Sequence, residues 1–266
     1  LITGAAGSIG QEIALTIAEL GGDLILVDLP NSNYDIVKKS ILDNWNVDIK
    51  CINCDLEDEN SRISLIKDVI KSNVNLDILI NNAALVGDSS LEGWVEDFDK
   101  QSVQVWNRAL GVNLTAPFHL SQAFTSLLKK SGNGSIINIA STYGINAPDY
   151  SLYKGTNMGN PAAYSASKGG LVQLTRWLST TIAPDVRVNC VAPGAVMTPA
   201  TKAALPSKEL LKSTASSIPL KRIAEPGEIA SVIAFLLSSE SSYLTGICIN
   251  ADGGKTSDLN AGISME

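Results

Sequence analysis

Short apolar runs rich in β-branched residues alternate with longer, helix-compatible stretches along this 266-residue chain. That alternation is typical of a parallel sheet whose two faces are covered by helices. The sequence therefore predicts a single α/β domain, residues 1–266, built on a doubly wound sheet of seven parallel strands. The expected strands are one that ends at Thr3, followed by Leu24–Asp28, Asp48–Cys54, Leu76–Asn81, Ser135–Ala140, Val186–Val191 and Ile247–Asn250.

Helices are expected between these strands, where apolar side chains recur at three- and four-residue spacing, as at Ile13, Ile17 and Leu20. Segments 143–161 and 195–218 differ, because they are long, poorly periodic and rich in Gly, Pro, Ser and Asn. Loops of that length in a compact domain are usually functional or mobile. The expected helices lie near 10–20, 33–45, 57–73, 98–130, 161–183 and 225–238.

Charge and hydropathy exclude two classes of partner. The 20 Lys and Arg face 27 Asp and Glu, the net charge is −7, and no basic run stands out, so nucleic acid is not expected as a partner. The longest apolar stretches, such as Val232 to Leu237, are far shorter than the ~20 residues that cross a bilayer. We expect no membrane span. The chain opens on Leu1 and turns at a glycine almost at once, so we expect some residues of its first strand to precede it.

The four cysteines do not form a disulfide framework, and three of them lie in apolar, β-like runs. Cys51-x-x-Cys54 has no second pair, and the chain contains a single histidine, His119. Metal or redox chemistry remains an alternative here, but we predict buried strand cysteines and no metal site. A reducing, cytoplasmic setting fits this cysteine usage best.

A glycine-rich turn, Thr3-Gly4-Ala5-Ala6-Gly7-Ser8-Ile9-Gly10, follows the first strand and opens a helix. In that context the glycines let the backbone approach a pyrophosphate, whose charge the helix N-terminus meets. Asp28 ends the second strand 18 residues after Gly10, where its carboxylate can accept hydrogen bonds from both hydroxyls of an adenosine ribose. A Rossmann-like dinucleotide site is expected, with a plain strand-to-helix turn as the alternative.

The charges around this turn indicate which dinucleotide binds. Residues 1–37 contain no Lys or Arg that could neutralise a 2′-phosphate, and Asp28 would repel one, so NAD is favoured over NADP. Asp55 and the turn 81–84 fall at the carboxyl edge of the sheet, where open α/β folds bind ligands. We expect Asp55 at the adenine ring and the turn at the adenosine ribose. Either segment is equally well explained as a side chain that stabilises a turn.

Tyr164 and Lys168 stand at i and i+4 at the start of a long helical stretch, which places them on one face. A tyrosine with an ordinary pKa is a poor acid or base at neutral pH, and a neighbouring Lys168 can help to lower that pKa. Tyr150 and Lys154 have the same spacing, but Gly155, Gly159 and Pro161 forbid a stable helix there. We therefore choose Tyr164.

Taken in order along the chain, these motifs resemble the short-chain dehydrogenase/reductase family over essentially the whole sequence. The ordered set is highly specific, whereas each motif alone would more often be structural. The motifs are the glycine loop at 3–10, Asn81–Ala84, Asn113 in Val112-Asn113-Leu114, Ser141 after the fifth strand, Tyr164 with Lys168, Pro193-Gly194 and Asp252-Gly253-Gly254.

The resemblance implies four catalytic residues. Tyr164 would be the general acid/base, Ser141 would hydrogen-bond the substrate oxygen, Lys168 would hold the nicotinamide ribose, and Asn113 would position a water in a proton relay. Val196 and Thr198 would hold the nicotinamide carboxamide. The cofactor-binding set implied in this way is Gly4, Gly7, Ser8, Ile9, Gly10, Asp28, Asp55, Leu56, Asn82, Ala83, Ala84, Tyr164, Lys168, Pro193, Gly194, Val196 and Thr198.

Three features depart from the family pattern. Ser8 and Ala84 stand where relatives of this length usually carry glycine, and the spacing Gly4, Gly7, Gly10 is more typical of the sugar-nucleotide-modifying branch. The interval from Ser141 to Tyr164 is longer than usual. We therefore expect 143–161 to be an insertion beside the active site, while 195–218 forms a loop over the substrate.

Four of the six tyrosines fall within residues 143–164, interleaved with polar side chains. Such rings suit the faces and hydroxyl edges of a sugar, whereas an acyl chain calls for Leu, Ile and Phe. The leading hypothesis is an NAD-dependent alcohol dehydrogenase or ketone reductase acting on a polar, sugar-like or sugar-nucleotide substrate. The alternatives are a 3-oxoacyl-thioester reductase and a non-catalytic, dinucleotide-sensing regulator. The resemblance also implies a homotetramer or homodimer.

Overall fold

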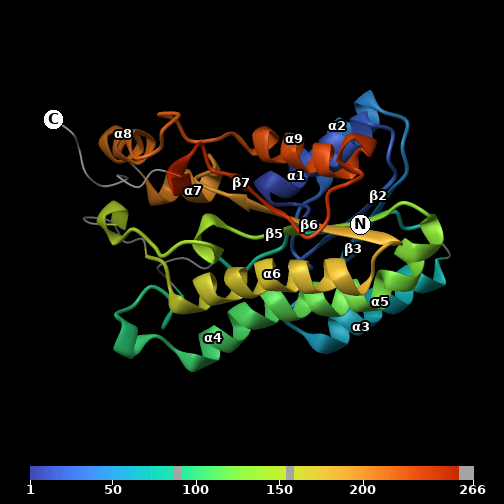
Figure 1. Cartoon of the computed structure of the whole chain (residues 1–266), viewed down its shortest axis with the longest axis horizontal. Coiled ribbons are helices and arrows are strands. Elements are labelled where there is room, and N and C mark those ends of the chain that lie inside the picture. Colours follow the sequence, from blue (N-terminus) through green and yellow to red (C-terminus); the bar gives the residue numbers. More distant parts are fainter. Residues whose placement is uncertain (73, 87–90, 154–158, 206, 258–266) are drawn as a thin grey trace.

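The computed structural model describes residues 1–72, 74–86, 91–153, 159–205 and 207–257, and it contains one sheet of seven parallel strands. The spatial order is β3-β2-β1-β4-β5-β6-β7, so the chain builds outward from β1 to one edge and then returns to build the other half (Figure 1). The seven predicted strands and their parallel pairing are confirmed. Their bounds are β1 Ile2–Thr3, β2 Leu24–Asp28, β3 Ile49–Asn53, β4 Ile78–Asn81, β5 Gly134–Ile139, β6 Val186–Pro193 and β7 Cys248–Ala251.

Helices cover both faces of the sheet, with α1, α2 and α9 on one side and α3, α5 and α6 on the other (Figure 1). Alternate residues of a strand supply the two cores: Leu26 packs with the first group, while Ile25 and Val27 pack with the second. Burial on both faces explains why these strands read as continuous apolar runs. The helix bounds are α1 Ser8–Glu19, α2 Asp35–Asn44, α3 Glu59–Lys71, α5 Ala116–Ser131, α6 Ala162–Thr181 and α9 Pro226–Leu237.

The segment expected as one helix near 98–130 is divided. Helix α4 covers Val103–Leu110, a π-helical turn follows at Gly111–Thr115, and α5 continues from there. The Ser102 hydroxyl accepts a hydrogen bond from the backbone N–H of Val105, which caps α4 and fixes its start. Sequence periodicity does not reveal this π turn, because five residues are too few to establish a change of period. Such turns often lie at functional sites.

The segment 195–218, expected as a loop over the substrate, contains regular structure, with α7 at Pro199–Ala204 and α8 at Lys208–Ser216. The side chains of Thr198 and Ser207 cap the two helices. Leu205, Ile218 and Ile223 form a small separate core beneath them. Both helices are short, so they show too few turns for an amphipathic period to be recognised.

The predicted insertion contains two 3₁₀ turns, at Thr142–Gly144 and Tyr150–Tyr153. Lys154, the partner of Tyr150 in the second Tyr-x-x-x-Lys match, lies outside the described residues. Among the helices that the structure describes, none combines the length and the apolar character needed to cross a bilayer.

The prediction of buried strand cysteines holds for Cys190 on β6, and it is wrong for Cys51, which is exposed. Cys54 is buried but follows the last residue of β3, and Cys248 on β7 is half-buried. Cys51 lies on β3, one of the two edge strands, whose residues are all half-buried or exposed. Cys190 and Cys248 face each other across β6 and β7 with their Sγ atoms 3.0 Å apart. The described residues contain no group of three or more His, Cys, Asp or Glu side chains arranged to hold a metal ion.

Candidate active site

A cleft of about 2080 Å³ opens at the carboxyl edge of the sheet. It lies where the strand order reverses between β1 and β4, which is the position at which open α/β folds bind ligands. Every site residue predicted from the sequence lines this cleft except Asn113. The structure therefore brings together residues of α1, β2, α6 and β6 and residues of the segments that follow β1, β3, β4, β5 and β6.

The glycine loop has two kinds of glycine. A Cβ on Gly10 would lie 2.1 Å from the carbonyl oxygen of Gly4, and one on Gly4, at φ +64°, would lie 2.8 Å from the Cα of Ala83. A Cβ on Gly7 would meet only the Gly4 oxygen, at 3.4 Å. Gly4 and Gly10 are therefore required for packing, whereas Gly7 leaves room on the side that faces the cleft, as expected for a loop that receives a pyrophosphate.

Asp28 ends β2 and links it to the glycine loop. Its Oδ2 accepts a hydrogen bond from the backbone N–H of Ala6 at 2.8 Å, and its Oδ1 accepts one from the hydroxyl of Ser32 and one from the N–H of Leu29, each at 2.8 Å. A carboxylate offers about four acceptor positions, so capacity remains for a ligand hydroxyl. Sequence reasoning missed Ser32, although a hydroxyl four residues after the carboxylate was available as a signal.

The turn after β4 is fixed to the glycine loop. Thr3 Oγ1 accepts hydrogen bonds from the N–H groups of Asn82 and Ala83, and Asn82 Nδ2 donates to the carbonyls of Thr3 and Gly4, both at 3.0 Å. The Asn82 amide thus positions the loop from behind, while Ala83 and Ala84 line the cleft. Thr3 is a second positioning residue that the sequence did not single out.

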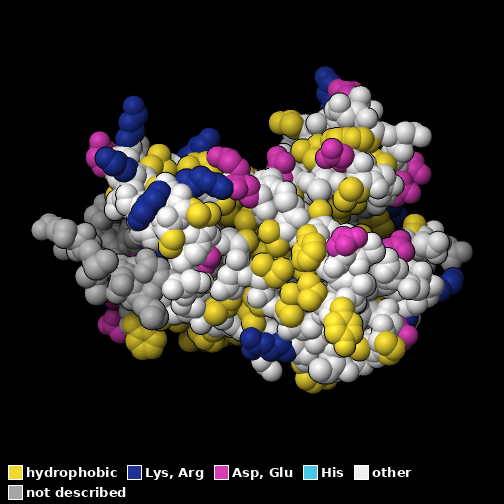
Figure 2. Space-filling view, turned by 45° about the horizontal axis from the view of Figure 1, so that its top comes forward, with side chains coloured by type: hydrophobic (Ala, Val, Ile, Leu, Met, Phe, Trp, Pro, Cys, Tyr) yellow, Lys and Arg dark blue, Asp and Glu magenta, His cyan; other side chains and the backbone are white. Residues whose placement is uncertain are grey.

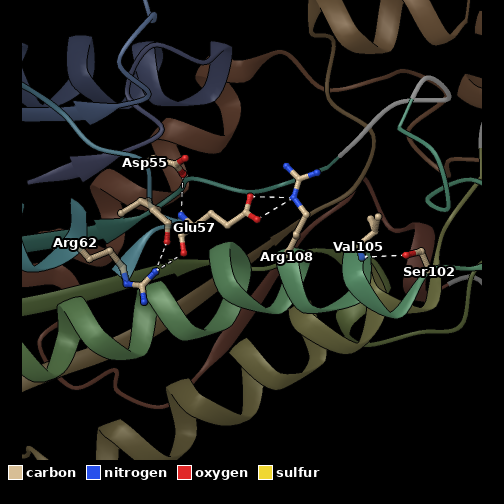
Figure 3. Close-up of polar contacts among 7 residues, drawn as sticks. Asp55, Glu57, Arg62, Ser102, Val105 and Arg108 are labelled. Carbon is tan, nitrogen blue, oxygen red and sulfur yellow. Dashed lines mark hydrogen bonds and ion pairs between the residues drawn. The ribbon is translucent and has the colours of Figure 1, made fainter. Parts of the chain in front are cut away.

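Asp55 and Leu56 line the cleft beside β3, and two arginines fix their turn (Figure 3). Asp55 Oδ1 accepts a hydrogen bond from the N–H of Glu57 at 2.9 Å. This contact is the one expected if Asp55 stabilises its own turn, the alternative to a contact with adenine. The buried Arg62 donates to the carbonyls of Leu56 and Glu57, and the carboxylate of Glu57 binds Nε of Arg108 on α4 at 2.9 and 3.0 Å. The sequence did not indicate either arginine. The Arg108 contact depends on the packing of α4, 51 residues along the chain, and Arg62, five and six residues from the carbonyls it binds, belongs to no recognised motif.

Asn113 lies in the π-helical turn and is fully buried behind the cleft. Its Oδ1 accepts a hydrogen bond from the N–H of Leu85 at 2.7 Å, and its Nδ2 donates to the carbonyl of Leu85 and to the hydroxyl of Ser167, both at 3.1 Å. Asn113 therefore connects the segment after β4 to Ser167 on α6, the residue that precedes Lys168.

Ser141, Tyr164 and Lys168 converge at the end of β5. Ser141 Oγ accepts a hydrogen bond from the N–H of Tyr143 at 3.2 Å, and a further hydrogen bond joins its side chain to Tyr164. Lys168 Nζ donates to the carbonyl of Ile139 at 2.7 Å and lies 5.9 Å from the centre of the Tyr164 ring. By contrast Tyr150 is 63% exposed, so the geometry favours the choice of Tyr164.

Burial dominates the electrostatics of this group. It raises the pKa of Tyr164, and the hydrogen bond with Ser141 offsets only part of that rise. It lowers the pKa of Lys168 from 10.5 to about 8. The lowered tyrosine pKa that the sequence suggests is therefore not present in the protein alone, because the ammonium is itself destabilised by burial.

The segment after β6 closes the cleft from the other side. Gly194 lies so close to β7 that a Cβ would meet the Cα of Asp252 at 2.9 Å. Met197 N donates to the carbonyl of Ala224, which holds Val196 in a short parallel bridge, and the hydroxyl of Thr198 caps α7. Pro193, Gly194, Val196 and Thr198 all line the cleft.

Residues of the predicted insertion line the opposite end. The Tyr153 hydroxyl donates to the Tyr143 hydroxyl at 2.5 Å, and both rings face the cleft with Asn160. Lys255, just after the Asp252-Gly253-Gly254 motif, reaches this end and lies 3.5 Å from Asp149 Oδ2. No local motif marks Lys255, since its proximity to segment 143–161 arises only in the fold.

Comparison with known proteins places the chain among oxidoreductases. A family model described as enoyl-(acyl carrier protein) reductase matches residues 4–256. The chain is similar to the 3-oxoacyl-(acyl-carrier-protein) reductase of Thermotoga maritima, with 35% identity over 258 residues, 96% of each protein. It is 40% identical over 156 residues to a tropinone reductase homologue of Arabidopsis thaliana, a match that spans 58% of this chain and 55% of that one.

Solved structures agree with these matches. A 4-hydroxyisoleucine dehydrogenase complexed with NADH has a TM-score of 0.81 and 27% identity, covering 97% of this chain and 98% of its own. A protein described as an NAD(P)-dependent gluconate 5-dehydrogenase from Beutenbergia cavernae, with bound NADP, has a TM-score of 0.84 and 29% identity, covering 97% and 96%. The parallel sheet, the glycine loop and the ordered motifs are thus shared along the whole chain, which belongs to the short-chain dehydrogenase/reductase family of oxidoreductases.

Proposed function

We propose that this protein is an NAD(H)-dependent oxidoreductase that interconverts a secondary alcohol and a ketone on a polar, sugar-like or sugar-nucleotide substrate. The observation that carries the proposal is the meeting of Ser141, Tyr164 and Lys168 at the inner end of a cleft whose other end has the features of a dinucleotide site. Buried titratable groups with shifted pKa values in a cleft are typical of active sites.

The residues present fit a nicotinamide dinucleotide. Gly7 leaves open space at the N-terminus of α1, and Asp28 keeps acceptor capacity beside it. Asp55, Leu56, Ala83 and Ala84 would flank the adenosine half, and Pro193, Gly194, Val196 and Thr198 would flank the nicotinamide half. When bound, the nicotinamide supplies the hydride acceptor or donor, and its oxidised form adds the positive charge that a lower Tyr164 pKa requires.

The chain's own residues would handle the substrate oxygen and its proton. Tyr164 Oη takes the proton of the substrate hydroxyl during oxidation and returns it during reduction. Ser141 donates to the same oxygen and holds it beside Tyr164. Lys168, with its pKa near 8, exchanges a proton close to neutral pH and holds the nicotinamide ribose. Asn113 fixes the segment after β4 to α6, in the position proposed for a water relay.

Several features support NAD rather than NADP. The residues that line the cleft around the end of β2 are Asp28, Leu29, Ser32, Asn33 and Ile36, none of which is a cation. Arg108 also lines the cleft, but its Nε is engaged by the carboxylate of Glu57. A 2′-phosphate would meet the Asp28 carboxylate without a compensating charge.

The polar substrate is supported by the side chains at the inner end of the cleft, where Tyr143, Asn146, Tyr153 and Asn160 present polar groups. The main alternative, a 3-oxoacyl-thioester reductase, is favoured by the description of the matching family and by the relative from Thermotoga maritima. A non-catalytic regulator has no need of a half-buried Tyr164 beside the buried Ser141 and Lys168.

One experiment separates these functions. NADH formation is measured with a panel of polyols, sugars, sugar nucleotides and hydroxyacyl thioesters, and the reverse reaction with the matching ketones. Turnover of hydroxylated, non-acyl substrates supports the proposal, turnover of thioesters alone supports the alternative, and dinucleotide binding without turnover of any class supports a regulator. We further propose a cytoplasmic homodimer or homotetramer, in keeping with the free thiols and the family.

A further inference from the structure

Two buried donors at the inner end of the cleft have no acceptor at good hydrogen-bond geometry, although the Tyr153 hydroxyl lies beside the Asn160 side chain and Asp149 lies beside Lys255. Among the described residues, four buried side-chain polar atoms have no partner: Asn81 Oδ1, Ser135 Oγ, Asn160 Nδ2 and Lys255 Nζ. Asn160 and Lys255 are the two of these residues that line the cleft, and both unpartnered atoms are donors. Since an unpaired buried donor is costly, a pair of them in a ligand cleft points to a ligand that supplies acceptors.

Lys255 is held close to the reacting residues through the insertion. Its Nζ lies 3.5 Å from Asp149 Oδ2, which is longer than a charge-assisted hydrogen bond of about 2.7–2.9 Å. Burial and the charge of Asp149 raise the pKa of Tyr143, and Tyr143 in turn adds to the effect of burial on Tyr164. Asp149 thus lies within electrostatic range of both Lys255 and Tyr143, and Tyr143 lies within the same range of Tyr164.

Asn160 approaches from the other side. Its Oδ1 accepts a hydrogen bond from the hydroxyl of Ser165 at 3.1 Å, which fixes the orientation of the amide. The side chain is buried, and its backbone carbonyl accepts from the hydroxyl of Tyr150. The amide nitrogen is therefore held in place just before the start of α6, four residues before Tyr164 in the sequence.

The adjacent surface is positively charged in an otherwise acidic protein. Residues 199–222, which include α7 and α8, contain five Lys and Arg and a single Glu, against a net charge of −7 for the chain. Lys202, Lys208 and Lys212 are exposed, and Figure 2 shows Lys and Arg side chains gathered over the end of the molecule that carries these helices. Such a field favours the approach of an anion to the cleft beneath it.

We propose that the substrate is a polyhydroxylated carboxylic acid or its keto form, with its carboxylate held by Lys255 Nζ and Asn160 Nδ2 and a secondary hydroxyl at Tyr164. This inference rests on the proposed function and specifies its substrate class. An ammonium and an amide supply donors for the two carboxylate oxygens. A phosphate ester fits less well, because Asp149 lies beside Lys255 and would repel a second negative charge.

The test compares aldonates with the alditols of the same carbon skeleton, such as D-gluconate with D-glucitol and D-mannonate with D-mannitol. The wild-type protein should show a kcat/KM for the preferred aldonate at least about tenfold above that for its alditol. Lys255→Met should remove most of this preference through a higher KM, with kcat and alditol turnover little changed. Lys255→Arg should retain it. Lys67→Met, an exposed charge removal on α3, is the matched control and should have no effect.

Binding gives a readout that does not need turnover. D-gluconate is titrated into the NADH-loaded protein while nicotinamide fluorescence is followed, and Lys255→Met should weaken binding about tenfold or more. Three results would overturn the carboxylate site. The wild-type protein could use alditols as well as or better than aldonates, or it could prefer sugar phosphates. Lys255→Met could also lose equal activity on the aldonate and on the matching alditol. Lys255-dependent gluconate binding without turnover of any hydroxylated compound would keep that site and reject the proposed reaction.

Discussion

The carboxylate of Asp28 accepts a hydrogen bond from the backbone N–H of Ala6, 2.8 Å away. The residue proposed to select the cofactor therefore also ties the end of β2 to the glycine loop. A change at Asp28 alters the charge seen by the adenosine ribose and the position of the loop that receives the pyrophosphate. These two effects can be separated by the choice of substitution.

Binding should favour NAD over NADP by at least tenfold, about 1.4 kcal/mol, because Asp28 opposes a 2′-phosphate and no cation offsets it. The double change Asp28→Ala with Leu29→Arg should narrow this gap, since the repulsion is removed and a phosphate partner is added. Leu29 is 54% exposed, so an arginine fits there. Fluorescence titration with both cofactors gives the ratio.

Asp28→Asn is the control for the loop contact, since an amide oxygen can still accept from Ala6. Asp28→Asn should weaken NAD binding less than Asp28→Ala does, and the preference for NAD over NADP should fall in both variants. Equal or tighter binding of NADP by the wild-type protein would sink the cofactor assignment.

Replacement by alanine should have different effects at Gly10 and at Gly7. In Gly10→Ala the new Cβ would lie 2.1 Å from the Gly4 carbonyl oxygen, so the backbone must shift, and we expect a loss of on the order of 2 kcal/mol or more in the free energy of unfolding. Gly7→Ala should fold nearly as stably, because the closest contact is 3.4 Å, but should bind NAD more weakly. Denaturant unfolding and NAD titration of both variants check this, and equal stability of the two would contradict it.

Tyr164→Phe should lower kcat by several orders of magnitude and leave NAD affinity nearly unchanged, because the change removes only the proton donor and acceptor. Tyr150→Phe should be mild, in keeping with the exposure of that ring. Steady-state kinetics with the substrate found in the panel measure both. An inactive Tyr150 variant beside an active Tyr164 variant would reverse the choice between the two Tyr-x-x-x-Lys matches.

The stability of the cofactor-free protein should depend on pH through Lys168. Its folded-state pKa, about 8, is below the ordinary 10.5, so between these values the unfolded chain binds more protons and stability rises with pH. Lys168→Met lacks this group, and its free energy of unfolding relative to wild type should be highest below pH 8 and fall as pH rises toward 10. Denaturation at pH 7, 8, 9 and 10 measures the difference, and a constant difference would refute the assignment.

Replacing Asp149–Gly159 with a short Gly-Ser bridge should raise KM strongly for the true substrate while NAD binding and the fold survive. The physical reason is that the cleft would lose Tyr153 and the Asp149 contact to Lys255, neither of which lies in the cores of the sheet. Kinetics and NAD titration on the shortened protein provide the measurement. If KM does not change, subunit assembly is the better explanation of the segment.

The sequence predicted those parts of the fold that local pattern controls. The strands buried on both faces were found because each is a continuous apolar run, and Tyr164 was preferred to Tyr150 because Gly155, Gly159 and Pro161 oppose a helix. Cys51 was misjudged, since nothing in a short apolar run marks the strand that lies at the sheet edge.

The parts that were missed depend on contacts between distant segments. The π-helical turn at Asn113 follows from packing against Leu85 and Ser167, and the position of Lys255 beside Asp149 exists only after β7 is in place. Arg108 likewise acts on the turn after β3 from α4, 51 residues away along the chain, whereas Arg62 binds carbonyls only five and six residues away. No periodicity or local motif records such pairings.

The hydrogen bonds between Thr3 and Asn82 have a consequence for engineering. The glycine loop and Asp28 belong to the first three strands, whereas Ser141, Tyr164 and Lys168 belong to the later part of the chain, and Asn82 Nδ2 joins the two by binding the carbonyls of Thr3 and Gly4. A chimera that exchanges the first three strands with those of a relative would therefore transfer cofactor preference as a module. Its success would depend on keeping a threonine and an asparagine at this junction rather than on matching the sequences of the two halves.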